Sequence, residues 1–319
     1  MNDNVSSHFS LFDVLGYLIP GALCLMLIKL VLFLPDVNSI DRSLIYMFLD
    51  VIKPEKATFS ESVFFLIFSY LCGHILGYAS SVTIEVFSHW MHGYPSSFLL
   101  RQKKPFFDKA PSNQSKGELR HDSVDTPMDD KSSIGFVYGK RERWCFNAFK
   151  VIISILIFPV SCCSFILGKL LRVEIFYLKP LDEKNINLIQ YKYNLLVIHL
   201  GLKYPDRYDA DHHRLIYHYV YDKFPSHRAK FDCYVAIYDF LRSVTFLLVC
   251  LFYYLLYIVA KNNLWSWGSL ISSVILALTS YFMYMAFMKF YRRFTLESFM
   301  CLLTDPYLKV KDLKKNLNL

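Results

Sequence analysis

The sequence predicts an all-α integral membrane protein with about four transmembrane helices, an interfacial or re-entrant helix and a small helical cytoplasmic domain. Three observations lead to this fold class. The 319 residues are 54% apolar and 17% aromatic, and a soluble domain of this size is usually less aromatic. The apolar residues gather in runs of about 20, the helix length that crosses a hydrocarbon core of roughly 30 Å. The basic residues gather mainly between these runs.

Four runs are predicted to span the membrane, at about 11–34, 62–86, 243–260 and 267–288. The first ten residues are polar, contain no Lys or Arg and precede no small-residue cleavage site. A signal peptide would begin with basic residues and end at a small-residue cleavage site. We therefore expect the first run to stay in the protein as a span.

A fifth apolar run, 149–171, is ambiguous because Pro159 interrupts it and basic residues flank it on both sides. Cytoplasmic loops of membrane proteins carry an excess of Lys and Arg. Segments 88–150 and 172–242 each hold eleven basic residues, and both can be cytoplasmic only if 149–171 does not cross. We predict an interfacial or re-entrant helix here and a cytoplasmic N-terminus.

These runs divide the chain into seven predicted segments. Residues 101–140 are rich in Ser, Pro, Lys and Asp and predict a mobile loop, whereas 181–240 carries apolar residues at helical spacing. The order is a cytoplasmic N-terminus (1–10), a transmembrane hairpin (11–86), a basic, partly mobile cytoplasmic segment (87–148), the interfacial or re-entrant helix (149–171), a helical cytoplasmic domain (172–242), a second transmembrane hairpin (243–288) and a basic cytoplasmic tail (289–319).

The first span contains residues that a simple anchor does not need. Pro20 removes a helix hydrogen bond and Gly21 loosens the backbone, so a kink is expected nearby. Asp13 can lie at the inner interface and Lys29 can extend outward along the helix, which would make each an ordinary feature. Together they make Asp13, Pro20 and Gly21 candidates for lining or gating a pore.

The second span has small residues at every fourth position, which form one smooth stripe on a helix and let two backbones approach closely. This stripe is predicted to serve either oligomerisation or packing within the same chain. Glu85 follows it and is a further pore candidate, unless it simply lies at the cytoplasmic interface. The stripe consists of Ser69, Gly73, Gly77 and Ser81.

The most polar constellation is "YDADHHRLIYHYVYDKF", residues 208–224. Arg214 and His218 fall on one helical face, which is interpreted as a solvated face, with an anion or nucleotide site as the alternative. A metal site is the least favoured reading, because the spacing matches no zinc motif. No nucleotide-binding or hydrolase motif is present, so we expect no enzyme, cofactor or metal.

The net charge of +8 has two readings. Basic loops can rest on anionic lipid, or they can form a cytoplasmic site for a phosphate-bearing ligand. The candidates for anion binding are Lys103, Lys104, Arg141, Arg143, Arg214, His218, Arg228 and Lys230.

The opening "FDVLGYLIPGALCL", Phe12 to Leu25, resembles a start shared by bacterial membrane proteins of defence loci, F-D-x-x-x-Y-L-x-P-G. Within that group, the order of spans and cytoplasmic segments is similar to that of the membrane effector of the Hailong anti-phage system. The resemblance implies a homo-oligomeric ion channel in the bacterial inner membrane. It also implies a partner nucleotidyltransferase whose DNA-oligomer or nucleotide product controls the channel.

Two hypotheses follow. The first is a pore-forming effector gated by an anionic ligand on its cytoplasmic side, which must bind the closed and open states unequally. The second is a non-conducting membrane scaffold that recruits a cytoplasmic enzyme. A transporter or intramembrane enzyme is disfavoured, since inverted repeats and paired ionisable residues in the spans are not evident.

Overall fold

The computed structural model describes residues 11–32, 59–101, 140–171, 178–201, 212–263 and 265–308. These residues form helices joined by short turns and contain no strand, which confirms the predicted helical class. The predicted N-terminal segment 1–10 and most of the predicted mobile loop 101–140 lie outside the described residues.

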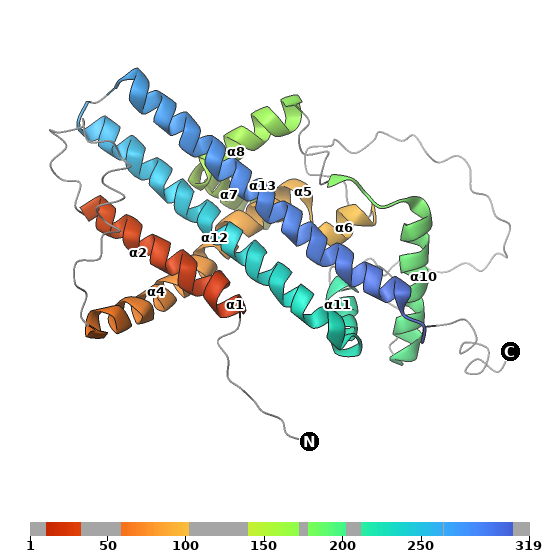
Figure 1. The fold of residues 1–319 in the computed structure, drawn as a ribbon. Helices are drawn as coiled ribbons and strands as arrows, with labels where there is room; N and C mark the ends of the chain where they lie inside the picture. Colours follow the sequence, from red (N-terminus) through yellow and green to blue (C-terminus); the bar gives the residue numbers. More distant parts are fainter. Residues whose placement is uncertain are drawn as a thin grey trace, which may run out of the picture.

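Two long antiparallel helices, α12 (Pro225–Lys261) and α13 (Trp267–Thr304), are the central elements of the fold (Figure 1). Proline at the first position of α12 suits a helix start, where its missing N–H leaves no bond unmade. α13 begins with a capping box: the Ser266 hydroxyl accepts from the Ser269 N–H at 3.3 Å, and the Ser269 hydroxyl accepts from the Ser266 N–H at 3.2 Å.

A second pair of helices packs beside α12. The first member runs without a break through α1 (Leu11–Asp13), a π-helical turn η1 (Val14–Leu18) and α2 (Ile19–Leu32). The second runs through α4 (Phe59–Ser80), a π-helical turn η3 (Ser81–Glu85) and α5 (Val86–His92), before the short α6 (Pro95–Leu99). The disturbance expected at Pro20 takes the form of η1, which ends two residues before it.

The backbones of α2 and α4 touch at two glycines. A Cβ added to Gly21 would lie 1.7 Å from the carbonyl oxygen of Ser69, and one added to Gly73 would lie 1.9 Å from that of Tyr17. A Cβ on Gly77 would meet the Tyr17 ring at 3.3 Å. Most of the predicted stripe thus packs within the same chain, whereas the Ser81 hydroxyl bonds its own helix at Tyr78.

The predicted helix 149–171 is bent. It comprises the end of α7 (Lys140–Leu156), α8 (Phe158–Cys163) and a π-helical segment η4 (Ser164–Leu170). Its halves, Ala148–Leu156 and Phe158–Gly168, meet at 95°. Their lengths are only about 14 and 17 Å at 1.5 Å per residue, so neither half crosses a hydrocarbon core alone.

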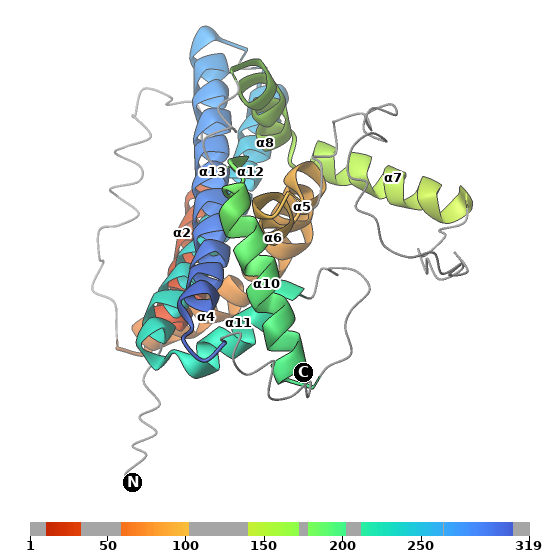
Figure 2. The same ribbon diagram turned by 90° about the vertical axis from the view of Figure 1, so that its right-hand side faces the viewer.

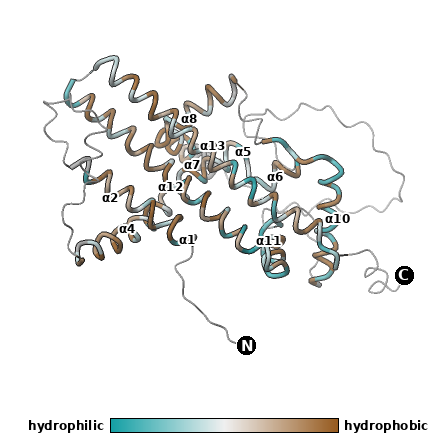
Figure 3. The backbone as a smooth tube through the Cα atoms, in the orientation of Figure 1, coloured by the Kyte–Doolittle hydropathy of each residue, from teal (hydrophilic) through white to brown (hydrophobic). Residues whose placement is uncertain are grey.

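Three described helices are long and apolar enough to cross a membrane: Ser62–Leu99, Pro225–Lys261 and Trp267–Thr304. Val14–Lys29 is apolar but shorter. The chain is therefore a helical protein with the features of a membrane protein, and the fourth span stays a prediction. Figure 3 shows the apolar colour along α2, α4 and the halves of α12 and α13 that lie near their connecting turn.

A polar helical domain surrounds the other ends of α12 and α13 (Figures 1 and 3). It contains α6, α10 (Glu183–His199) and α11 (His212–Lys223). Its core is fully buried at Leu196, Ile216, Phe231 and Phe299, among others. The boundary predicted at residue 242 falls inside α12, so this domain and a membrane-type helix share one continuous rod.

Two bonds fasten this domain to the end of α13. Lys192 of α10 donates to the carbonyl oxygen of Asp305 at 2.7 Å, and the Tyr219 hydroxyl of α11 donates to the Asp305 carboxylate at 2.6 Å. Burial and this carboxylate raise the pKa of Tyr219. Both helices are therefore tied to the residue that follows α13.

Gly73→Ala is expected to destabilise the protein by about 1–3 kcal/mol, because the added methyl would force α4 away from the backbone of α2. The measurement is thermal unfolding in detergent. Gly16→Ala is the matched control, since its Cβ would meet only the Phe12 ring at 3.8 Å. Equal unfolding temperatures for the two variants would contradict the close approach.

Acid is expected to weaken the polar domain through His213. Its Nε2 is buried, its ring lies 5.8 Å from Phe294 and 5.7 Å from Phe299, and burial, with the neighbouring His212, lowers its pKa to about 3. Because the unfolded imidazole titrates near pH 6.5, stability falls as the pH drops from about 6.5 to 3, by roughly 2–3 kcal/mol at pH 4.5.

This acid sensitivity is measured as the unfolding midpoint against pH. His213→Phe is expected to reduce the loss, while His218→Phe, an exposed position on the same helix, is expected to keep it. A wild-type pH profile that is flat between pH 7 and 4.5 would show that His213 does not behave in this way.

Candidate functional site

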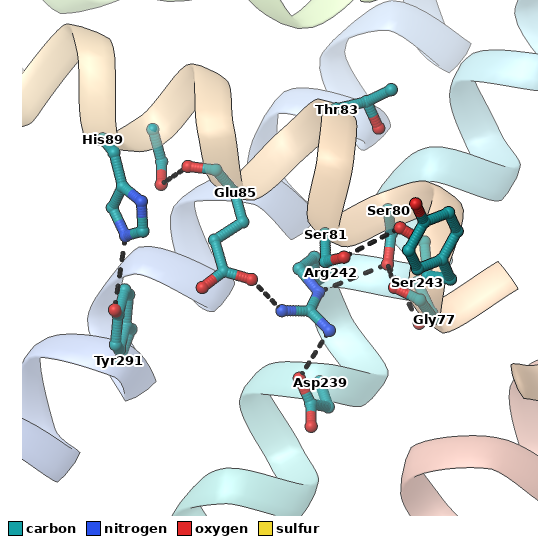
Figure 4. A network of polar contacts seen from close by, with 12 residues as sticks. Gly77, Ser80, Ser81, Thr83, Glu85, His89, Asp239, Arg242, Ser243 and Tyr291 are labelled. Carbon is teal, nitrogen blue, oxygen red and sulfur yellow. Dashed lines mark hydrogen bonds and ion pairs between the residues drawn. The ribbon is translucent and has the colours of Figure 1, made fainter.

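Buried polar side chains meet where α4 and η3 face α12 (Figure 4). Arg242 is at the centre and is 9% exposed. The other members come from α4, η3 and α12, and they are Ser80, Glu85, Asp239 and Ser243.

The guanidinium of Arg242 contacts three side chains. One terminal nitrogen forms an ion pair with Glu85, and the other lies 2.8 Å from the Asp239 carboxylate. Its Nε donates to the Ser80 hydroxyl at 3.2 Å. The two hydroxyls of Ser80 and Ser243 lie 3.5 Å apart. A single cation thus connects α4, η3 and α12.

The local sequence explains this arrangement. Asp239 and Arg242 are three residues apart on α12, so their side chains lie on one helical face. Glu85 is the last residue of η3, and a π-helical turn places one extra residue in a helix and shifts the faces that follow it. The π turn therefore sits where it sets the direction in which Glu85 points.

The network lies near one edge of the apolar region. From Arg242 to Lys261, at the end of α12, the helix rises about 29 Å, close to the thickness of a hydrocarbon core. Glu85 was predicted as a pore candidate or as a residue of the cytoplasmic interface, and in the structure it is partly buried and paired with Arg242. The network is thus at the junction between the apolar helices and the polar domain.

Charge pairing controls the energetics of this junction. A buried ion whose partner is removed costs about 3–5 kcal/mol, whereas an intact pair is close to neutral. Arg242 is shared by two carboxylates, so the network couples the positions of α4, η3 and α12 and permits two alternative pairings.

Aromatic contacts extend the network to the other helices. The His89 ring of α5 lies 3.3 Å from the Tyr291 hydroxyl of α13 (Figure 4). Tyr17 of η1 stacks on His74 of α4, with ring centroids 3.9 Å apart. These contacts connect α5 with α13 and η1 with α4.

The predicted pore candidates lie on these elements. Asp13 ends α1, which packs against α12, while Pro20 and Gly21 are buried in α2. Glu85 joins the Arg242 network. Within the described residues, the interior between α5, α12 and α13 is filled by the fully buried Tyr284, Phe287 and other side chains, so this part of the chain shows no pore.

The structure describes the side chains of four of the eight predicted anion-binding residues, which are Arg214, His218, Arg228 and Lys230. Arg228 donates to the carbonyl oxygen of Tyr221 at 2.7 Å, and Lys230 donates to Glu297 at 2.7 Å. Arg214 and His218 are exposed on α11. The side chains of Arg141 and Arg143, and all of Lys103 and Lys104, lie outside the described residues. The anion site therefore stays a prediction.

Asp239 and Arg242 were not among the residues predicted from the sequence. The available signal was the D-x-x-R pair directly before an apolar run, a position where an ionisable side chain needs a partner. The identity of that partner, on a helix more than 150 residues away, was not readable from spacing.

Comparisons with known proteins found no matching family, no similar curated protein and no similar solved structure.

Arg242→Met is expected to destabilise the protein by about 3–5 kcal/mol, because Glu85 and Asp239 lose their common cation. Thermal unfolding in detergent measures this. Arg293→Met is the matched control: Arg293 is exposed on α13 and lies over the Phe290 ring. A triple variant that adds Glu85→Gln and Asp239→Asn should recover much of the loss; no recovery would argue against the ion pairs.

Proposed function

We propose that the protein is a membrane effector whose copies assemble into an ion-conducting pore and whose polar domain controls that pore. The observation that carries the proposal is the buried Arg242, paired with Glu85 and Asp239 at the junction of the two parts. A protein that only needs an anchor gains nothing from this junction, since buried charges are costly unless they are paired.

Control from the polar domain is supported by the continuity of α12. Phe231, near its start, is fully buried in the domain core, and Arg242 lies three turns later on the same helix. A tilt of the domain therefore moves Arg242 relative to Glu85. A ligand produces that tilt only if it binds the two arrangements with different affinity.

Assembly of several copies is supported by the packing within one chain. The described interior is filled by aliphatic and aromatic side chains, so an ion path is expected between copies. The small-residue stripe is largely used inside the chain, which leaves the exposed apolar faces for lipid and for neighbouring copies. Exposed apolar side chains on α4 include Phe64, Phe65, Leu66, Ile67, Phe68, Leu71 and Ile75.

The topology we propose has four spans, a cytoplasmic N-terminus and a re-entrant or interfacial helix at 149–171, in the bacterial inner membrane. It is supported by the basic residues Arg292 and Arg293 at the domain end of α13, and by the exposed Trp265 and Trp267 at the other end. The 95° angle between Ala148–Leu156 and Phe158–Gly168 suits a helix that enters the membrane and does not cross it.

The ligand we propose is a short DNA oligomer or nucleotide made by a partner nucleotidyltransferase, and the role is anti-phage defence. This part is supported by the opening motif and by the net charge of +8. The alternative is a non-conducting scaffold, which α7 favours: its N-terminal part projects from the body (Figure 2) and begins with basic residues, while its C-terminal part packs in the core at Ile153.

Ion flux through the purified protein in sealed liposomes tests the proposal. Flux is expected to change at least about tenfold when a short DNA oligomer is added, and Arg242→Met is expected to abolish that response. Arg293→Met should respond like the wild type. Where Arg242→Met does not insert, Asp239→Asn, which keeps the Glu85 pair, is used in its place.

Absence of flux in every condition, with protein shown to be folded and inserted, would exclude the pore and favour the scaffold. Flux that ignores the oligomer and is unaltered by Asp239→Asn would leave a pore but remove the proposed control through Arg242.

A further inference from the structure

A group of three metal-ligating side chains lies in the polar domain, away from the Arg242 network. Within the residues that the structure describes, His227, Glu297 and Cys301 bring one donor atom each to within 4.8 Å of one another. His227 lies near the start of α12, whereas Glu297 and Cys301 lie near the end of α13.

The spacing along the chain suits a metal site. Glu297 and Cys301 are four residues apart, so both side chains project from one face of α13. His227 faces them from the adjacent helix, and its Nδ1 lies 3.1 Å from the Glu297 carboxylate oxygen. Two ligands from one helix and a third from its neighbour give donors in three directions around a common point.

We propose that His227 Nδ1, the Glu297 carboxylate and the Cys301 thiolate bind one Zn²⁺ ion, which clamps the start of α12 to the end of α13. Tetrahedral zinc with bonds of 2.0–2.3 Å has ligand atoms about 3.5 Å apart. The His227–Glu297 distance is already close to this value. The Cys301 sulfur lies within 4.8 Å of both other donor atoms, so metal binding has to draw it inward.

The chemistry of the donor set selects the metal. A thiolate excludes the hard cations Mg²⁺ and Ca²⁺, which prefer oxygen ligands. Imidazole, carboxylate and thiolate together are ligands that zinc accepts, and three protein ligands leave a fourth position for water. The Cys301 proton leaves to solvent when the metal binds.

The proposed ligands differ in how far they are exposed to solvent. The Cys301 residue is buried with 3% exposure, which shields the thiolate from oxidants. The His227 side chain is 40% exposed, so an ion enters from its side. The chain therefore provides an entry path together with a protected sulfur.

Lys230 is the competitor for this site. Its ammonium lies 2.7 Å from the same Glu297 oxygen that His227 contacts. Because its side chain is half exposed, it can turn into solvent when an ion takes the carboxylate. Removing this positive charge should tighten zinc binding, whereas removing a ligand should weaken it.

The test is a titration of the purified full-length protein in detergent with Co²⁺, which reports thiolate ligation by a near-ultraviolet absorption band, followed by displacement with Zn²⁺. One Co²⁺ per chain and a thiolate band are expected for the wild type. Cys301→Ser should lose the band, while Cys233→Ser, a cysteine of α12 outside the group, should keep it.

Three other variants should change the affinity for Zn²⁺ in opposite directions, which a general loss of folding would not do. His227→Asn and Glu297→Gln should each weaken Zn²⁺ at least tenfold, and Lys230→Met should strengthen it about tenfold. No thiolate band in the wild type, or a band that survives Cys301→Ser, would overturn the proposal. Weaker binding in Lys230→Met would also contradict it, and none of these readouts depends on ion flux.

Discussion

A guanidinium buried next to apolar helices needs partners, and this requirement organises the centre of the molecule. Arg242 finds Glu85 on η3, Asp239 on its own helix and the Ser80 hydroxyl on α4. Since a buried charge without a partner costs several kcal/mol, the positions of α4 and α12 are coupled through one side chain. Packing by apolar contacts alone would leave the helices free to slide, because such contacts have little directionality.

The close approach of α2 and α4 works alongside this constraint. Gly21 and Gly73 each face a backbone carbonyl of the other helix, at Ser69 and Tyr17. In a membrane, helix association depends on such close packing, since lipid is as apolar as the side chains. The opening motif thus has a structural explanation in this chain, because Tyr17 and Gly21 are both contact residues. That explanation is independent of any function that the motif suggests.

The polar domain and the apolar hairpin are joined by two continuous helices rather than by a linker. α12 and α13 each begin or end in the domain core and continue into the apolar region without interruption. Forces applied to the domain therefore act directly at the level of Arg242. A zinc ion at His227, Glu297 and Cys301 would hold the domain ends of α12 and α13 together, and so would make the connection between the domain and Arg242 more rigid.

The sequence by itself determined the helical membrane class, the positions of the apolar runs, the small-residue stripe and the interruption of the fifth run at Pro159, because hydropathy, helical period and proline act locally. Only the tertiary structure decided that the stripe packs largely within the chain, that Glu85 meets Arg242, and that His227 meets residues 70 positions further along. The sequence predicted Glu85 as a pore candidate or an interfacial residue, but no partner for it. The physical reason is that a pairing between distant helices depends on which faces meet, and neither composition nor spacing records that.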